Sequence, residues 1–335
     1  KRSLADIDAA TGALTYSYPL RVPQGRRSMQ PNLALAYNSQ SNEEGSLFGF
    51  GWSLTLPSIE RKNLNGTNKL YTSHDFTSPD GDLEYVSGSG NTIVFKSKIE
   101  NGDFKTYTLH NESTGGWWSV SSKDGMTIEY GNESDARLDN PNDSTKVFRW
   151  YVTKVTDTLG NFVDYNYIKV GEEVYPENIT YTNNGVNIGI FNVEFVLENR
   201  PDIAINAKPG FIVTTIKRIQ RIKTYISSSL VGDYYLQYSQ DSVNNRSKLI
   251  SVQFTGYDEN SQSITEPATS FTYNSLGDSG FLSQITESTG GTSVFEYKPS
   301  TQYKDSSNNL LNPKLPFVVF TVSKITYNDG NGISW

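Results

Sequence analysis

The feature that most constrains this chain is the alternation of apolar residues with small or polar ones between Gly12 and Arg61. Apolar side chains occupy every second position in three successive runs, Leu14–Val22, Leu33–Tyr37 and Phe48–Leu56. Period-two alternation places one set of side chains on one face of a pleated strand. We therefore predict three strands, each with one apolar face that a second layer must cover. This pattern predicts a scaffold and contains no catalytic group.

In the third run, Gly49, Gly51, Ser53 and Thr55 lie opposite the aromatic residues. A glycine inside a strand often marks the close approach of another backbone. We expect a second backbone to pass this face, opposite Trp52. A branched side chain at Gly51 is then expected to damage folding.

These residues also carry a family resemblance. The strings Gly12–Gly25, Gln30–Ser39, Gly49–Leu54 and Ile59–Arg61 resemble the opening of the SpvB-type amino-terminal domain. That domain begins the B components of bacterial Tc (toxin complex) insecticidal toxins and the Salmonella virulence plasmid B protein. The signature positions in this part of the chain are Tyr16, Tyr18, Pro19, Pro23, Gly25, Pro31, Tyr37, Asn38, Gly49, Gly51, Trp52 and Arg61.

The resemblance implies a function as well as a fold. It implies a non-enzymatic, all-β shell domain that helps to enclose and deliver a toxic polypeptide, with a β-propeller and Rhs/YD repeats further along the chain. It implies other toxin-complex subunits as partners, a pore-forming A component and a C component with the toxic cargo. Such a toxin is expected to be secreted, after a period in the cytoplasm, and to need no cofactor.

Composition argues against several other classes of protein. The formal net charge of −7 argues against nucleic-acid binding, which favours a basic surface. The chain has no cysteine, so disulfides and thiolate zinc sites are excluded. No apolar run approaches the ~18 residues of a membrane span, so membrane insertion by this segment is not expected. The chain begins at Lys1 without a signal-peptide pattern, which is typical of a mature or truncated piece.

The chain beyond Arg61 is typical of an antiparallel, hairpin-rich β protein. We expect an N-terminal segment over residues 1–11, with one helical turn in Leu4–Ala10, and one all-β domain over residues 12–335. A sub-boundary is expected near residues 132–146, which resemble a polar surface loop. In Phe211–Lys223 helix and strand compete, and the β-branched residues favour one long strand. The predicted strands are Lys69–Thr72, Leu83–Val86, Thr92–Lys98, Phe104–Asn111, Trp117–Ser121, Met126–Tyr130, Val186–Leu197, Phe211–Ile226, Asp233–Tyr238, Leu249–Tyr257 and Ala268–Tyr273.

A weak internal repeat supports this organisation. Val152–Asn161 and Leu282–Gly291 each lead into a glycine turn, at Gly160 and Gly290, and a strand with a tyrosine, Tyr165 or Tyr297, follows. The pattern resembles the Rhs/YD hairpin, whose copies form a β shell. A third copy, Val322–Asn331, leads to the point where a returning strand is expected to begin, so we expect the natural protein to continue past Trp335.

Candidate chemistry is sparse. The two histidines, His74 and His110, are isolated in sequence, and no nucleophile elbow accompanies them. Asp80, Asp82 and Glu84 come close together in sequence, either as a calcium loop or as a solvated hairpin turn. The spacing lacks the full calcium-loop pattern and favours the turn.

Aromatic residues leave an alternative open. Trp117 and Trp118 are adjacent, so on a strand one is expected in the core and the other at the surface. Exposed aromatics suggest an extracellular adhesin or carbohydrate-binding module as the second hypothesis. The Salmonella member of the family ends in an ADP-ribosyltransferase domain, but this sequence contains neither its Ser-Thr-Ser strand nor its Glu-x-Glu pair. We therefore expect this segment not to be an enzyme.

Overall fold

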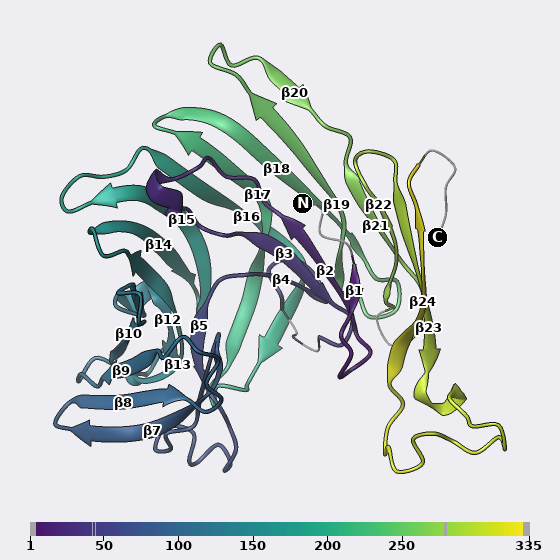
Figure 1. The fold of residues 1–335 in the computed structure, drawn as a ribbon, viewed down its shortest axis with the longest axis horizontal. Helices are drawn as coiled ribbons and strands as arrows, with labels where there is room; N and C mark the ends of the chain where they lie inside the picture. Colours follow the sequence, from purple (N-terminus) through teal and green to yellow (C-terminus); the bar gives the residue numbers. More distant parts are fainter. Residues whose placement is uncertain (1–4, 42, 44, 278–279, 331–335) are drawn as a thin grey trace.

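The structure is a computed structural model that describes residues 5–41, 43, 45–277 and 280–330. The described residues form antiparallel strands joined by turns (Figure 1). Short 3-10 turns lie at Arg26–Ser28 (η1), Ser134–Ala136 (η2) and Ser300–Gln302 (η3). The predicted all-β, hairpin-rich fold is confirmed. Within these residues, no helix has the length and apolar character needed to cross a membrane.

The first strands form a small sheet, called here the inner sheet. It consists of β1 (Asp6–Ile7), β2 (Leu14–Pro19), β3 (Ala34–Asn38) and β4 (Trp52–Leu54), paired in that order. The last three are the strands predicted from alternation, although β2 and β4 are shorter than their apolar runs and β3 is shifted by one residue. The predicted helical turn in Leu4–Ala10 is wrong for the described residues, because Asp6 and Ile7 pair with β2.

The next strands close into a barrel. Their bounds are β5 (Ser58–Arg61), β6 (Phe76–Ser78), β7 (Gly81–Ser89), β8 (Thr92–Ser97), β9 (Thr106–His110), β10 (Trp117–Ser121), β11 (Thr127–Tyr130), β12 (Arg137–Asn140) and β13 (Asp143–Thr156). Each strand from β5 to β11 pairs with the next, β11 pairs with β13, and β13 returns to β5. Aromatic rings fill the interior, where the Trp118 ring lies 4.9 Å from Phe76 and 5.9 Å from Trp150.

Two predictions in this region are wrong. Lys69–Thr72 is a turn, in which the Thr72 amide donates to the Lys69 carbonyl (3.0 Å). Residues 132–146 are not a surface loop, because they contain η2, β12 and the start of β13. Buried Arg137 donates to the Thr114 carbonyl (2.7 Å), and such bonds allow a polar segment to pack. The domain sub-boundary expected there stays a prediction.

From β13 the chain continues as a curved open sheet. Its strands are β14 (Asn161–Val170), β15 (Glu173–Asn184), β16 (Phe191–Asn206), β17 (Val213–Ile226), β18 (Ser229–Gln240), β19 (Ser247–Tyr257), β20 (Ser263–Thr265), β21 (Thr269–Tyr273), β22 (Leu282–Thr286), β23 (Thr292–Pro299) and β24 (Phe320–Asn328). β17 is the one long strand that β-branching predicted. β15 was not predicted; it contains Pro176 next to a register irregularity, a position that tolerates proline.

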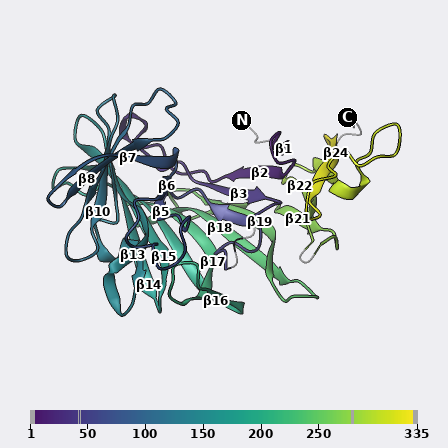
Figure 2. The same ribbon diagram turned by 90° about the horizontal axis from the view of Figure 1, so that it is seen from below.

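The main core lies between the inner sheet and one face of the open sheet. Figure 2 shows the barrel at one end of the molecule, β21–β24 at the other, and the inner sheet between them. Buried side chains of both sheets form one cluster, among them Leu14, Leu35, Ile222, Leu236 and Ile285. Burying each such side chain contributes about 1.5–3 kcal/mol. The open sheet is therefore the second layer that the apolar face of the inner sheet requires.

Candidate functional site

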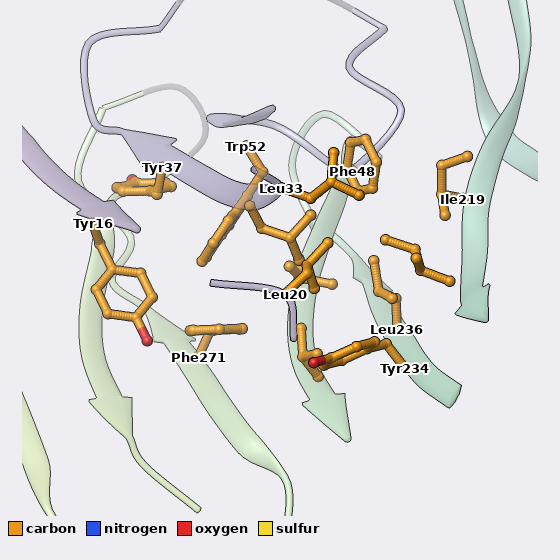
Figure 3. Close-up of a cluster of buried hydrophobic side chains, with 14 of the residues drawn as sticks. Tyr16, Leu20, Leu33, Tyr37, Phe48, Trp52, Ile219, Tyr234, Leu236 and Phe271 are labelled. Atoms are coloured by element: carbon orange, nitrogen blue, oxygen red, sulfur yellow. The ribbon is translucent and has the colours of Figure 1, made fainter. Parts of the chain in front are cut away.

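The contact between the two sheets centres on Trp52. Its indole Nε1 donates to the Tyr273 hydroxyl (2.8 Å), and that hydroxyl donates to the Leu249 carbonyl (2.7 Å). The Trp52 ring lies 4.6 Å from Phe271 and 5.4 Å from Tyr37, between ring centroids (Figure 3). Trp52 is 2% exposed, so both bonds are shielded from water. The indole therefore ties β4 to two strands of the open sheet.

The signature tyrosines of the inner sheet also reach the open sheet. The Tyr37 hydroxyl accepts the Leu282 amide (3.0 Å), and the Tyr16 hydroxyl donates to Glu287 Oε1 (3.4 Å). The Tyr18 ring meets the ring of Tyr234 edge-on at 6.4 Å. These residues fix the inner sheet by hydrogen bonds and by ring packing.

The signature prolines and turn residues shape the connections. Pro19 ends β2, Pro31 is buried before β3, and the Pro23 carbonyl accepts the Tyr181 hydroxyl (2.7 Å). Gly25 packs against the backbone of Met29, which a Cβ would meet at 2.1 Å. The exposed Asn38 accepts the amide of Gln40 (2.8 Å) in the turn after β3.

Gly49 and Gly51 differ from the prediction. Both precede β4 and have positive φ, +88° and +83°, so they belong to a turn and not to a strand face. A Cβ on Gly49 would meet the Ser247 carbonyl at 2.9 Å, which confirms a close backbone at this position. A Cβ on Gly51 would instead meet the ring of Tyr37 at 2.6 Å. The expected backbone opposite Trp52 is therefore wrong for Gly51.

A regular tyrosine array crosses the open sheet; we call Tyr238, Tyr273 and Tyr297 the tyrosine ladder. Each follows a register shift, and each pairs with a residue of the next strand: Leu249, Leu282 and Val322 respectively. The shifts skip Ile250, Ser283 and Ser323, as a β-bulge does. The bulges thus recur at the same level of successive hairpins.

The ladder hydroxyls replace main-chain pairing where each ladder strand separates from the neighbouring strand that carries its acceptor. Main-chain pairing with that strand ends at Arg221, Ser251 and Gln284, two residues before the ladder level. There, the hydroxyls donate to the carbonyls of Ile219 (2.5 Å), Leu249 (2.7 Å) and Leu282 (2.8 Å). Burial raises the pKa of all three phenols well above the ordinary value, so they remain protonated donors.

The inner sheet and the segments that flank its strands, together called the inner layer, accept hydrogen bonds from main-chain amides at the ladder level. The Ile219 amide donates to the Leu47 carbonyl (2.9 Å), and the Val322 amide donates to the Gly12 carbonyl (3.0 Å). Leu282 donates to the Tyr37 hydroxyl, as above. An unpaired buried amide or carbonyl costs about 1–3 kcal/mol. The inner layer therefore covers apolar surface and also accepts these amides where the strands of the open sheet separate.

The repeat positions fall where the hairpin interpretation placed them. Gly160 and Gly290 have positive φ (+78° and +89°) in the turns before β14 and β23. Tyr165 packs against three hydrophobic clusters of the described residues, and burial raises its pKa to about 12. Tyr297 is a ladder residue. The returning strand expected after Asn331 lies outside the described residues.

Arg61 lies apart from the other signature residues, at the end of β5. Its Nε donates to the Val147 carbonyl (2.9 Å) and its Nη1 to the carbonyls of Leu70 (3.3 Å) and Ser73 (3.2 Å). The guanidinium also lies over the Phe76 ring at 4.8 Å. Burial lowers its pKa to about 10. Arg61 therefore holds the β5–β6 connection to the barrel.

Both histidines lie in aromatic surroundings, His74 in the connection before β6 and His110 at the end of β9. His74 stacks on Tyr85 at 5.4 Å between ring centroids. His110 stacks on Trp117 at 4.1 Å, and its Nε2 lies 2.8 Å from Ser119 Oγ. This serine–histidine contact is a diagonal one between β9 and β10, in which His110 is paired with Trp117 and Ser119 with Thr108.

The carboxylates of Asp80, Asp82 and Glu84 do not converge on one point. Asp80 contacts Lys105 (2.9 Å), Asp82 contacts Lys62 (2.6 Å) and Glu84 contacts Lys96 (3.4 Å). Across the described residues, no group of three or more His, Cys, Asp or Glu is placed to hold a metal ion. Each carboxylate instead forms its own ion pair with a lysine around the hairpin.

The tryptophan pair divides as predicted. Trp118 is fully buried in the barrel, while Trp117 is only partly buried. One face of Trp117 is stacked on His110, and its Nε1 donates to Glu112 (3.2 Å). Carbohydrate binding by such aromatics stays a prediction.

Sequence reasoning missed Tyr238 and Tyr273 as members of an array. A tyrosine near the end of a hairpin strand could have indicated the array. In the sequence, such a tyrosine was recognised only in the repeats that contain a glycine turn. The acceptor of each hydroxyl lies on a neighbouring strand, 15 to 24 residues away in sequence, so local sequence does not identify it.

Comparisons with known proteins agree with this geometry. The family model described as Salmonella virulence plasmid 65kDa B protein matches residues 8–187. The Mono(ADP-ribosyl)transferase SpvB of Salmonella typhimurium is 24% identical over 179 residues, which are 47% of this chain and 30% of that protein. This chain thus corresponds to less than a third of that relative's length.

Two solved structures show the same fold. The N-terminal domain of the effector protein SpvB from Salmonella typhimurium strain LT2 has a TM-score of 0.63 and 17% identity, over 76% of this chain and 100% of that chain. A chain of the Photorhabdus luminescens Tc holotoxin pore has a TM-score of 0.71 and 16% identity, over 98% of this chain and 19% of that chain. Because the family model matches more than half of its residues, the chain belongs to the family of the Salmonella virulence plasmid 65kDa B protein.

Proposed function

We propose that this segment is a non-enzymatic wall domain that helps to enclose a toxic polypeptide and deliver it with other toxin-complex subunits. In this proposal the assembly is secreted, and the domain contributes a two-layered wall. A wall of this kind separates an unfolded cargo from proteases and from aggregation partners.

The observation that carries the proposal is the completed hydrogen bonding between the two layers. Neighbouring strands of the open sheet separate at the ladder level, and such gaps in a single layer would expose backbone groups. Ladder hydroxyls and the inner layer fill them. The result is a continuous wall, which suits enclosure better than it suits a mobile catalytic site.

The names of similar proteins support the proposal. One similar solved structure is a Tc holotoxin pore, and one relative is named a mono(ADP-ribosyl)transferase, of which this chain spans 30%. We propose that transferase chemistry, where a member of the family has it, does not reside in the segment matched here.

Protease protection tests the enclosure. The gene's full product is assembled with its C-type partner and treated with protease, and the survival of the cargo is followed with time. We expect protection in the native assembly, faster cargo loss in Trp52→Ala and native protection in Tyr85→Phe, a half-exposed barrel residue. Digestion of the cargo at the rate of free cargo in the native assembly would refute enclosure.

A separate assay tests the absence of enzymatic activity. The purified segment is incubated with labelled NAD and host-cell extract. We expect no transfer of label to any protein, and transfer that depends on the segment would contradict this part of the proposal.

A further inference from the structure

A cavity of about 270 Å³ lies where the barrel, the open sheet and the inner sheet meet. It is bounded by β12 and β13 of the barrel, by β14, β15 and β17 of the open sheet, and by β4 with the residues after it. Its apolar wall consists of Leu54, Leu56, Leu138, Phe148, Val174 and Val213. At ~30 Å³ per water-sized atom, the cavity has room for a small organic molecule of about nine non-hydrogen atoms.

The side chain of Tyr167 belongs to this cavity. It packs in one hydrophobic cluster with four residues of the apolar wall, Leu138, Phe148, Val174 and Val213. Tyr167 is 7% exposed, and its hydroxyl is buried without a hydrogen-bond partner among the described residues. A buried hydroxyl without a partner is costly, so it indicates an acceptor that the chain itself does not supply.

Tyr151 provides a second hydroxyl next to the first. Its ring centroid lies 5.3 Å from that of Tyr167, and both residues line the cavity. The Tyr151 hydroxyl accepts Arg149 Nη1 (3.2 Å), and no group in the described part of the chain accepts its own proton. Burial raises the pKa of Tyr151 to about 12 and that of Tyr167 well above the ordinary value, so both phenols remain donors. A carbonyl oxygen, with two lone pairs, can accept from both.

The charges around the cavity are balanced. Arg149 is paired with Glu60, and Lys208 Nζ lies 2.6 Å from the same carboxylate. Glu43, 3.7 Å from Arg149, supplies a second carboxylate, so two cations face two anions. Glu173 also lines the cavity, and burial raises the pKa of its carboxyl and thereby favours the neutral form. A charged ligand would find no uncompensated partner here, and burying such a charge is costly. The balance therefore favours a neutral ligand.

We propose that this cavity binds a small neutral carbonyl compound with one apolar chain, of the size of 2-octanone. Its carbonyl oxygen accepts from the hydroxyls of Tyr151 and Tyr167, and its hydrocarbon chain lies against the apolar wall. A largely apolar cavity with a few polar groups is the usual form of a small-molecule site. This inference is independent of the enclosure function, since no contact between the two sheets described above depends on the ligand.

Isothermal titration calorimetry of the purified protein with 2-octanone tests the proposal. We expect saturable binding at one site, weakened about fivefold in Tyr167→Phe, because one hydrogen bond between neutral groups is lost. Val213→Phe fills the cavity and is expected to abolish binding, whereas Tyr85→Phe, on the barrel, is expected to bind as the parent does. Octanoate and octylammonium, which have the same chain length and a charged head, are each expected to bind at least about tenfold more weakly than 2-octanone.

Urea denaturation without ligand tests whether the Tyr167 hydroxyl is free. Tyr167→Phe removes an unpaired buried hydroxyl and keeps the ring, so its urea midpoint is expected to equal or exceed that of the parent. A hydroxyl that the folded chain itself satisfies would instead give a lower midpoint in this variant, and that result would remove the basis of the site.

Three binding results would also overturn the proposal. One is absence of saturable 2-octanone binding at millimolar concentration. Another is equal affinity in the parent and Tyr167→Phe, which tests the site even if Val213→Phe fails to fold. The third is binding of octanoate or octylammonium as tight as that of 2-octanone, which would exclude a site for neutral ligands.

Discussion

Tyr273→Phe is the sharpest perturbation of the tyrosine ladder. It removes one hydroxyl and keeps the ring, so its cost arises from hydrogen bonding and not from lost packing. Two groups lose their partner: the Trp52 indole N–H and the Leu249 carbonyl. At about 1–3 kcal/mol for each unsatisfied buried group, the expected loss is about 2–6 kcal/mol of the free energy of unfolding.

Urea denaturation, followed by tryptophan fluorescence and far-UV circular dichroism, measures this loss. We expect a lower midpoint with an unchanged slope, which reports lost stability and not a changed compactness. Tyr85→Phe, whose side chain is 49% exposed, is the control and is expected to stay within ~0.5 kcal/mol of the parent.

A double-mutant cycle separates the hydrogen bond between Trp52 and Tyr273 from the bond between Tyr273 and the Leu249 carbonyl. In the double variant Trp52→Phe, Tyr273→Phe, the indole donor and its acceptor are both absent. We expect the double variant to cost about 1 kcal/mol less than the sum of the single ones. A Tyr273→Phe loss no larger than that of Tyr85→Phe, or strict additivity in the cycle, would refute the reasoning.

Three further predictions address the turn, the buried phenols and the histidines. Gly49→Ala is expected to lower the free energy of unfolding by at least ~1 kcal/mol more than Gly81→Ala in urea denaturation, because both have positive φ but only Gly49 has backbone within 4 Å; equal losses would contradict the close contact. The pKa of the Tyr165 phenol is near 10 in the unfolded chain and about 12 in the folded protein. Above pH 10 the unfolded state therefore binds fewer protons than the folded state, and the free energy of unfolding falls by ~1.4 kcal/mol per pH unit because of Tyr165. Tyr165→Phe is expected to flatten the fall between pH 10 and 12, and an unchanged slope would exclude this cause. His74→Ala and His110→Ala are expected to leave activity in any toxin assay unchanged, whereas lost activity with an intact fold would revive an enzymatic interpretation.

Much of the fold was predictable, because local alternation determines which face of a strand is apolar. The strands β2, β3 and β4 and the split between Trp117 and Trp118 follow from side-chain periodicity, and the long β17 follows from its β-branched residues. The repeat also predicted the turns at Gly160 and Gly290. These features depend on residues that are close in sequence.

The rest depends on contacts between distant residues. Closure of the barrel pairs Trp150 with Ile59, which no local pattern specifies. Gly51 alternates with aromatics as in a strand, yet its φ and its contact with Tyr37 place it in a turn. Of the three ladder residues only Tyr297 belongs to the sequence repeat, whereas the bulges at Tyr238, Tyr273 and Tyr297 recur at the same level in space.

The most direct test of the central claim is a cryo-electron microscopy reconstruction of the gene's full product, alone and with its partner subunit. The account predicts that this segment forms part of the wall of an enclosed chamber, with the inner sheet seated on the tyrosine ladder. A reconstruction in which the segment lies outside any chamber, or in which the inner sheet has left the ladder, would contradict it.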